Sequence, residues 1–492
     1  MHFENLLCLA ALVGIFFFLY RKTIKTDTVV LLAIVFIVLN VRFFYIADWI
    51  AARNSLLAAI FGVGSIGAYH VFQSSQRLPS IFFSVFLFIM GLFSGESSVA
   101  AFAYIVSYAF FMDKGKALKR FGYPLLFLII IILWRIVYKE LGYSVSGSGL
   151  YIDPGKDMAR FISQICMQGP LILVSSFFAP SLTAFSEFSP RMTKAAVSVS
   201  LIVCAIIAWW LLGTVKKHAE ARWFLGGALV ALPISCAGRL MSERMTIFVV
   251  LGIVPVIAMA IFDTLYAFFK KKASIKLLPF LAVCISSLLI FLHLVYPVYF
   301  RIEKALRRAP SASTQTTGAF SAIDSIEIKR NLIVINATDP GLSYYPYVKS
   351  VLGFGYPPSI QFLASSPLPL RIVRNDSATL SILSASSIIP DLFMDSDKGP
   401  FKSRIYRSFY FMAVFRAENQ PFHESWSRTL PGMRVSILSL NSYGFPKGAK
   451  FTFDHCLDSH FYSWIYWNWQ RKSYSFFPIP VIGDTAYISG AW

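Results

Sequence analysis

Long apolar runs separated by short polar loops dominate the first 300 residues of the chain. Runs of this kind approach the roughly 20 residues that a helix needs to cross about 30 Å of hydrocarbon. They lie near 5–20, 28–47, 54–72, 79–94, 98–112, 121–138, 161–180, 195–213, 223–238, 245–267 and 275–300. The pattern predicts an all-α polytopic membrane bundle over residues 1–300.

Lysine and arginine gather in five of the loops between these runs. The loops contain Arg21/Lys22/Lys25, Arg77, Lys114/Lys116/Lys119/Arg120, Lys216/Lys217/Arg222 and Lys270/Lys271/Lys272/Lys276. Because basic loops stay on the cytoplasmic side of a membrane, all five are expected to share that side. Successive loops then alternate between the two sides of the membrane everywhere except across 138–213. In that stretch, one apolar run must fail to cross.

The run at 161–180 is the one that we predict not to cross. It carries Gln164, Gln168 and a central Gly169-Pro170 pair, which breaks a helix unless neighbours satisfy the freed backbone groups. We interpret it as a re-entrant or interfacial segment. About ten transmembrane helices then remain, and both ends of the chain lie outside.

The character of the sequence changes after residue 300. Residues 301–318 are typical of a charged exit helix followed by a linker, and 319–492 of a β-rich soluble domain. Short runs of strand composition lie at Leu332–Asn336, Leu370–Val373, Thr379–Leu383, Tyr406–Phe415, Val435–Leu440 and Lys450–Phe453. Because one helix follows the most basic loop, this domain is predicted to be extracytoplasmic.

Composition supports a membrane protein. It argues against a nucleic-acid-binding protein and against a fold held by disulfides or cysteine zinc sites. Hydrophobic residues make up 56% of the chain and charged residues 14%, whereas soluble domains carry about 25% charged residues. The net charge is +20, but the basic residues lie in membrane loops, so no nucleic-acid partner is expected. Of six cysteines only Cys456 lies in the soluble part, which argues against a disulfide framework or a cysteine zinc site.

Three local motifs each allow a structural and a functional interpretation. Gly62-Val-Gly64-Ser-Ile-Gly67 matches a dinucleotide-binding pattern but sits in an apolar helix without a preceding strand, so helix packing is expected. Asp454–His460 contains metal-ligand residue types without a metal-binding spacing, and we predict no metal or other resident cofactor. The aromatic run Phe461–Trp469 fits either glycan contact or a domain core.

Charged residues gather on the outer face under this topology. They are Asp48, Arg53, Glu96, Arg135, Lys139, Asp153, Lys156, Asp157, Arg160, Arg239, Glu243 and Arg244. Glu96 is expected below the surface, because the two apolar runs beside it have only about 15 residues each, or roughly 22 Å of helix. Ionisable groups at such depth often mark a polar cavity. The alternative is a set of structural ion pairs and snorkelling side chains.

Four short motifs in residues 1–300 share their order and spacing with one enzyme family. The stretch Asp48-Trp49-Ile-Ala-Ala-Arg53-Asn-Ser-Leu56 resembles the Trp-Ile-x-x-Arg-x-x-Leu signature of GT-C-fold membrane glycosyltransferases, particularly the O-mannosyltransferase-like bacterial relatives. Ser94-Gly-Glu96-Ser-Ser98 resembles their Ser-Lys-Glu-Ser/Thr-Ala turn, with Gly95 in place of the lysine. Leu133-Trp-Arg135 followed by Leu141-Gly142 resembles their Leu-x-x-Arg…Leu-Gly helix end, and Ser242-Glu243-Arg244 their later arginine turn.

The resemblance implies transfer of a sugar from a polyprenyl-phosphate donor to a glycan or protein acceptor on the outer face. Arginine forks bind phosphate bidentately, and the residues expected to contact the lipid phosphate are Arg53, Arg135, Arg239 and Arg244. Glu96 or Asp48 would serve as the catalytic base. The family's first helix and acidic first external loop have no counterpart here, which implies a truncated or catalytically inactive relative.

These expectations place the chain in a bacterial inner membrane with its C-terminal domain in the periplasm. The rival hypothesis is a non-catalytic membrane scaffold that binds a membrane lipid or a lipid-linked component, because binding needs no carboxylate near the donor's anomeric carbon. A transporter ranks third, since broken helices and buried charges also occur in transporters but no repeated halves are visible.

Overall fold

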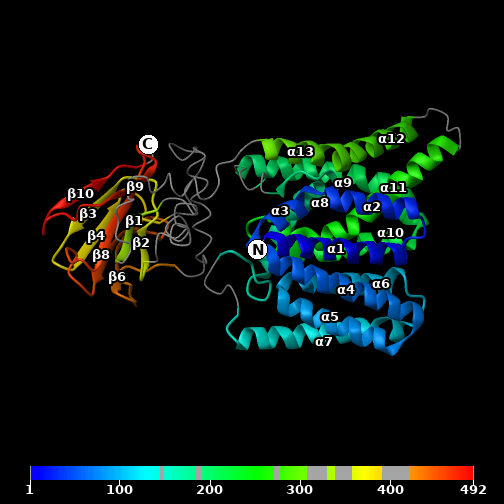
Figure 1. The fold of residues 1–492 in the computed structure, drawn as a ribbon, viewed down its shortest axis with the longest axis horizontal. Coiled ribbons are helices and arrows are strands. Elements are labelled where there is room, and N and C mark those ends of the chain that lie inside the picture. Colours follow the sequence, from blue (N-terminus) through cyan, green and yellow to red (C-terminus); the bar gives the residue numbers. More distant parts are fainter. Residues whose placement is uncertain are drawn as a thin grey trace. The chain divides into compact units, whose positions relative to one another are not determined.

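A computed structural model describes residues 2–143, 149–182, 185, 188, 190–270, 277–306, 330–337, 357–389 and 421–490. The chain divides into two compact units (Figure 1). One comprises Met1–Ser144 and Tyr151–Arg307, and the other Val145–Leu150 and Arg308–Trp492. The first unit is helical and the second is rich in strands.

Every predicted apolar run in residues 1–300 contains a helix, and most of the helices run side by side (Figure 1). The α-helices are α1 His2–Thr23, α2 Asp27–Leu39, α3 Val41–Asp48, α4 Arg53–Ser75, α5 Leu78–Ser94, α6 Ala100–Phe111, α7 Ala117–Glu140, α8 Met158–Phe178, α9 Pro190–Lys217, α10 Ala219–Ser235, α11 Ile247–Lys270, α12 Leu277–Ile290 and α13 Tyr296–Leu306. Short 3-10 helices are η1 Ile50–Ala52, η2 Glu96–Val99 and η4 Glu243–Thr246, and η5 Phe291–Val295 is a π-helix. The helical class predicted for this part of the chain is confirmed.

Seven helices in the described residues are long and apolar enough to cross a membrane. An eighth span arises if α2 and α3, which meet at Asn40 with a bend of 45°, form one broken helix. The shorter α5 and the combined η2–α6 segment are also apolar. An integral membrane protein is therefore supported, whereas the count of about ten crossings stays a prediction.

Helix α11 lies at the centre of the bundle, with 89% of its apolar window buried. The Tyr20 hydroxyl of α1 donates to the Leu251 carbonyl of α11 at 2.7 Å, although both lie in apolar surroundings. A Cβ atom added at Gly62 of α4 would lie 2.7 Å from the Phe248 ring of α11. This close approach confirms the helix-packing interpretation of the glycine motif at Gly62.

Helix α8 is continuous through Gly169-Pro170, and by length and composition it is one of the seven candidate spans. Near its start the Gln164 side chain donates to the carbonyls of Cys236 and Gly238 at 2.7 and 2.8 Å. Just beyond its end the Leu182 N–H donates to Glu243 at 2.6 Å. The segment between α10 and α11 therefore contacts α8 at Gln164 and the chain just beyond the end of α8, and the non-crossing placement of 161–180 stays a prediction.

The second unit contains ten described strands in two sheets (Figure 1). The strands are β1 Asn331–Asn336, β2 Ile360–Ala364, β3 Leu370–Arg374, β4 Thr379–Ser384, β5 Ser427–Leu430, β6 Met433–Leu440, β7 Pro446–Phe453, β8 Tyr462–Asn468, β9 Ser473–Phe476 and β10 Thr485–Ile488. One sheet has the order β2-β1-β8-β9 and the other β10-β3-β4-β7-β6-β5. Strand β1 pairs in parallel with both β2 and β8, and the second sheet is antiparallel throughout.

The core of this unit is built from both sheets. Ile333 and Ile335 of β1 share one buried cluster with side chains of β3, β4 and β7. Leu332 and Val334 of β1 join a second cluster with residues of β8 and β9. Because successive strand residues point to opposite faces, the four-stranded sheet is buried on both sides.

Five of the predicted strand runs correspond to β1, β3, β4, β6 and β7, whereas Tyr406–Phe415 lies outside the described residues. The aromatic run Phe461–Trp469 contains β8. In it Tyr462, Trp464 and Trp467 are buried, and only Phe461 is exposed. These burials favour the core interpretation over glycan contact.

Candidate functional site

Arg53 begins α4 at the N-terminal end of α1. Its Nε donates to the Asn5 side chain at 2.9 Å, and its Nη2 forms an ion pair with Glu4 at 2.6 Å. The Asn5 amide in turn donates to the carbonyls of Ala47 and Trp49 at 3.2 and 3.3 Å. These contacts tie the Trp49–Arg53 turn to the start of α1.

Arg244 approaches the same turn from η4. Its guanidinium carbon lies 5.1 Å from the centre of the Trp49 ring, within cation–π range. Its Nη2 donates to the Tyr151 hydroxyl at 3.1 Å. Tyr151 forms an antiparallel bridge with Gly238, which fixes the residues before α8 against the segment after α10. Arg244 therefore links three stretches that are distant in sequence.

Arg135 and Glu96 join this assembly through α7. The Arg135 Nη2 forms an ion pair with Asp153 at 2.7 Å, two residues after Tyr151. Its guanidinium carbon also lies 5.8 Å from the Tyr138 ring centre. The Tyr138 hydroxyl donates to the Glu96 carboxylate. Glu96, a predicted base, and Arg135, a predicted phosphate-binding residue, therefore both contact Tyr138.

The other two predicted residues lie beside these contacts. Asp48 is exposed at the end of α3, next to Trp49. Arg239 is half-buried, and its carbonyl accepts from Gln168 at 3.0 Å. Arg53 and Arg135 remain 34% and 43% exposed although each has a carboxylate partner. Both the polar-cavity and the ion-pair hypotheses are compatible with this geometry.

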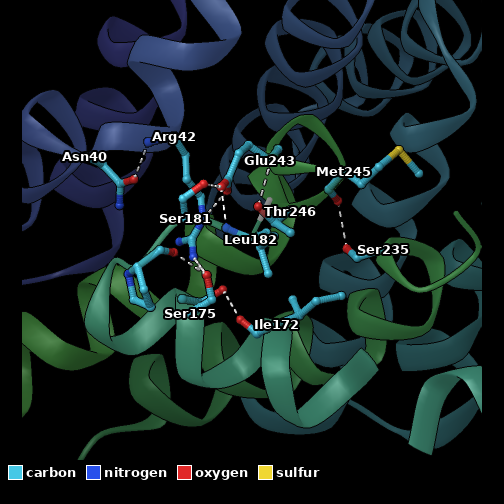
Figure 2. A network of polar contacts seen from close by, with 12 residues as sticks. Asn40, Arg42, Ile172, Ser175, Ser181, Leu182, Ser235, Glu243, Met245 and Thr246 are labelled. Atoms are coloured by element: carbon cyan, nitrogen blue, oxygen red, sulfur yellow. Dashed lines mark hydrogen bonds and ion pairs between the residues drawn. The ribbon is translucent and has the colours of Figure 1, made fainter. Parts of the chain in front are cut away.

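A buried ion pair between Arg42 and Glu243 was not predicted from the sequence (Figure 2). Their side chains are only 3% and 7% exposed, and Nε lies 2.9 Å from the carboxylate. Glu243 also accepts from the Ser181 hydroxyl at 3.0 Å and from the Leu182 N–H. Nη2 of Arg42 donates to Ser175. These hydrogen bonds offset part of the cost of burying the pair, while Nη1 of Arg42 is buried without a partner among the described residues.

The pair positions part of the predicted site. Glu243 precedes Arg244 in η4. Arg42 lies at the start of α3, which ends at Asp48, and Trp49 follows directly. Holding Glu243 to Arg42 therefore fixes both sides of the Arg244–Trp49 contact. The sequence signal was present, because Arg42 is a charged residue inside an apolar run.

Among the described residues no group of three or more His, Cys, Asp or Glu side chains could hold a metal ion. Arg374 and Asp458 form an ion pair beside Cys456 in the second unit. His455 instead packs on the Phe461 ring, with centroids 4.1 Å apart. Asp458 and His455 thus take part in packing and pairing contacts inside their own unit.

Comparisons with protein-family models, curated proteins and solved structures found no match to this chain. The resemblance to GT-C glycosyltransferases therefore rests on the motifs alone. Their residues Trp49, Arg53, Glu96, Arg135 and Arg244 nevertheless lie around one end of the bundle, connected by the contacts described above.

Proposed function

We propose that this chain is a GT-C-like membrane glycosyltransferase that binds a polyprenyl-phosphate sugar at the bundle end around Trp49. The observation that carries the proposal is the convergence of Arg53, Arg135 and Arg244 on this end. Three guanidinium groups, each held by hydrogen bonds or ion pairs to nearby residues, suit an anionic headgroup. The exposed apolar helix surfaces suit its lipid tail. The strand-rich unit would help to recognise the acceptor.

A bound lipid phosphate would replace the carboxylates that now pair with the arginines. Glu4, which pairs with Arg53, is 55% exposed, so water can solvate it once a phosphate takes its place. Arg135 is likewise accessible beside Asp153. A bidentate arginine–phosphate contact is stronger than an exposed pair with a flexible carboxylate. The proposal therefore needs only local side-chain movement.

Glu96 and Asp48 are the proposed bases. Glu96 accepts a hydrogen bond from Tyr138, which orients its carboxylate toward the side of α7 that carries Arg135. Asp48 is adjacent to Trp49 and exposed. A positioned general base is typically worth about 10²–10⁴-fold in rate. Transfer should therefore fall by this order when the operative carboxylate is neutralised.

We also propose ten crossings with both chain ends on the outer side. Two features support the count: the five basic loops share one side only if one run between 138 and 213 does not cross, and α2 and α3 together form one bent candidate span. The count leaves α8 out. The other six long helices, the bent α2–α3 pair and the shorter α5, η2–α6 and α10 then make ten alternating crossings. The outer side is then the periplasm of a bacterial inner membrane.

A non-catalytic lipid-binding scaffold is the second candidate. It is favoured by the internal carboxylate partners of Arg53 and Arg135, which leave both cations satisfied without a ligand. Catalysis separates the two candidates, because a scaffold would bind the lipid without transferring sugar.

Two assays on the purified full chain test the proposal. Binding of polyprenyl phosphate should weaken at least tenfold in Arg53→Ala and Arg244→Ala, and Arg→Lys should recover it only partly because an ammonium forms no fork. Arg77→Ala is the matched control. Arg77 is exposed in the turn between α4 and α5, at the end of α4 opposite to Arg53. Unchanged binding in both site variants would refute the phosphate site. Transfer that survives both Glu96→Gln and Asp48→Asn would refute the proposed bases.

A further inference from the structure

The outer face of the six-stranded sheet carries a groove that none of the preceding arguments uses. On β3 and β4 the residues Leu370, Ile372, Leu380 and Ile382 are buried in the core. The alternating residues Arg371 and Leu383 therefore point away from the core. The groove has a volume of about 530 Å³ and lies at the end of the sheet where β3 begins and β4 ends.

Paired residues of four strands form the row along this groove: Tyr487 of β10 pairs with Arg371, Arg371 with Leu383, and Leu383 with Gly448. Ser439 of β6 is the partner of Gly448 at an irregularity in the β6–β7 pairing, and it also lines the groove. Residues directly opposite each other share a face, so their side chains lie side by side. Gly448 contributes no side chain, and the Leu383 side chain lies over it: a Cβ atom added at Gly448 would be only 2.5 Å from Leu383 Cδ2.

The two sides of the groove differ in chemistry. Tyr487 is 74% exposed on the edge strand and is paired with Arg371 of β3. Lys447 adds a second exposed cation, whereas the described residues that line the groove include no carboxylate. Ser384 and Ser439 supply hydroxyl groups. The lining thus offers an aromatic face, two positive charges and small hydrogen-bonding groups.

We propose that this groove binds an acidic saccharide. A sugar ring would stack on Tyr487, and its carboxylate would contact Arg371 and Lys447 through charge-assisted hydrogen bonds. An extended peptide that adds a strand to this sheet would pair beside the edge strand β10 and not over the groove, because β3, β4 and β7 are each paired on both sides. The proposal rests on the glycosyltransferase function only in treating the bound glycan as the acceptor.

Calorimetry on the full chain in detergent tests the groove with tetragalacturonate as the acidic probe. Maltotetraose is the neutral probe of equal length, and a tetra-aspartate peptide is the acidic probe of another class. We expect Arg371→Gln to weaken tetragalacturonate binding about tenfold and Tyr487→Ala about fivefold, with recovery in Tyr487→Phe. Arg428→Gln and Phe476→Ala, exposed residues outside the groove, should leave the affinity unchanged.

Four results would overturn the inference: no binding of tetragalacturonate at millimolar concentration, equal binding of maltotetraose, equal binding of tetra-aspartate, or unchanged affinity in both groove variants. Sugar transfer is measured separately. If tetragalacturonate binds through Tyr487 while no transfer is detected, the groove stands and the enzyme proposal fails. If sugar transfer occurs and tetragalacturonate does not bind, the enzyme proposal stands and the groove proposal fails.

Discussion

Removing one member of the Arg42–Glu243 pair should destabilise the bundle far more than removing both. Arg42→Ala leaves Glu243 with two donors, the Ser181 hydroxyl at 3.0 Å and the Leu182 N–H at 2.6 Å. Glu243→Ala leaves the Arg42 guanidinium with Ser175 as its remaining side-chain partner among the described residues, and also strands the Leu182 N–H. The two single variants therefore differ in how much polar surface they leave unpaired.

The magnitudes follow from the burial of the pair. Breaking a buried ion pair by removing one partner costs about 3–5 kcal/mol. We expect Arg42→Ala near the lower end, at about 3 kcal/mol, and Glu243→Ala near the upper end, at about 5 kcal/mol. The double replacement Arg42→Met with Glu243→Leu removes both charges and keeps the volume, so its stability should return to within about 1–2 kcal/mol of the wild type.

Equilibrium unfolding of the full chain in mixed micelles, titrated with SDS and followed by tryptophan fluorescence, measures these differences. Arg21→Ala is the matched control, because the Arg21–Asp27 pair is 52% and 75% exposed and should be worth less than about 1 kcal/mol. An Arg42→Ala variant within 1 kcal/mol of the wild type would refute the reasoning. A double variant less stable than either single variant would refute it equally.

Three further predictions concern other parts of the chain. Single cysteines in the loops before and after α8 should both react with a membrane-impermeant reagent from outside, and labelling of only one would make α8 a true span. Gly62→Ala should cost about 1–3 kcal/mol by overpacking against α11, whereas Gly14→Ala, with open space around it, should not destabilise the fold. The hydrogen bond from Arg374 lowers the pKa of Asp458 below its ordinary 3.8, so its contribution is present above that pH and is lost as the pH falls through the lowered value. Asp458→Asn should therefore destabilise the strand-rich unit at pH 7 by less than about 1 kcal/mol, and by less as the pH falls below 3.8, as followed by near-UV circular dichroism.

Apolar run length was sufficient to predict the helices, because a membrane helix satisfies its own backbone and needs no distant partner. The break at Asn40 was missed because the apolar pattern continues across it from α2 into α3. In the second unit, β1, β3, β4, β6 and β7 were predicted from β-branched composition. The short strands β2, β5, β9 and β10 were missed, since four or five residues carry little periodicity and their pairing depends on neighbours.

The site was predictable as a set of positions but not as a set of contacts. Arg53, Arg135 and Arg244 were identified from motif spacing, and they do lie at one end of the bundle. Their partners Glu4, Asp153 and Tyr151 come from segments that no local pattern connects with them. The Arg42–Glu243 pair spans 201 positions in sequence, a separation that periodicity cannot bridge.

The parallel pairing of β1 has a consequence for how the chain is made. The side-chain amide of Asn331 in β1 contacts the Phe461 carbonyl just before β8, which is 130 positions later. During synthesis, β1 therefore cannot pair with β8 until most of the remaining chain has been made. Contacts between such distant segments slow folding and prolong exposure of unpaired edges. Chains that end before β8, through truncation or stalled synthesis, should expose Leu332 and Val334 and become substrates for quality-control proteases.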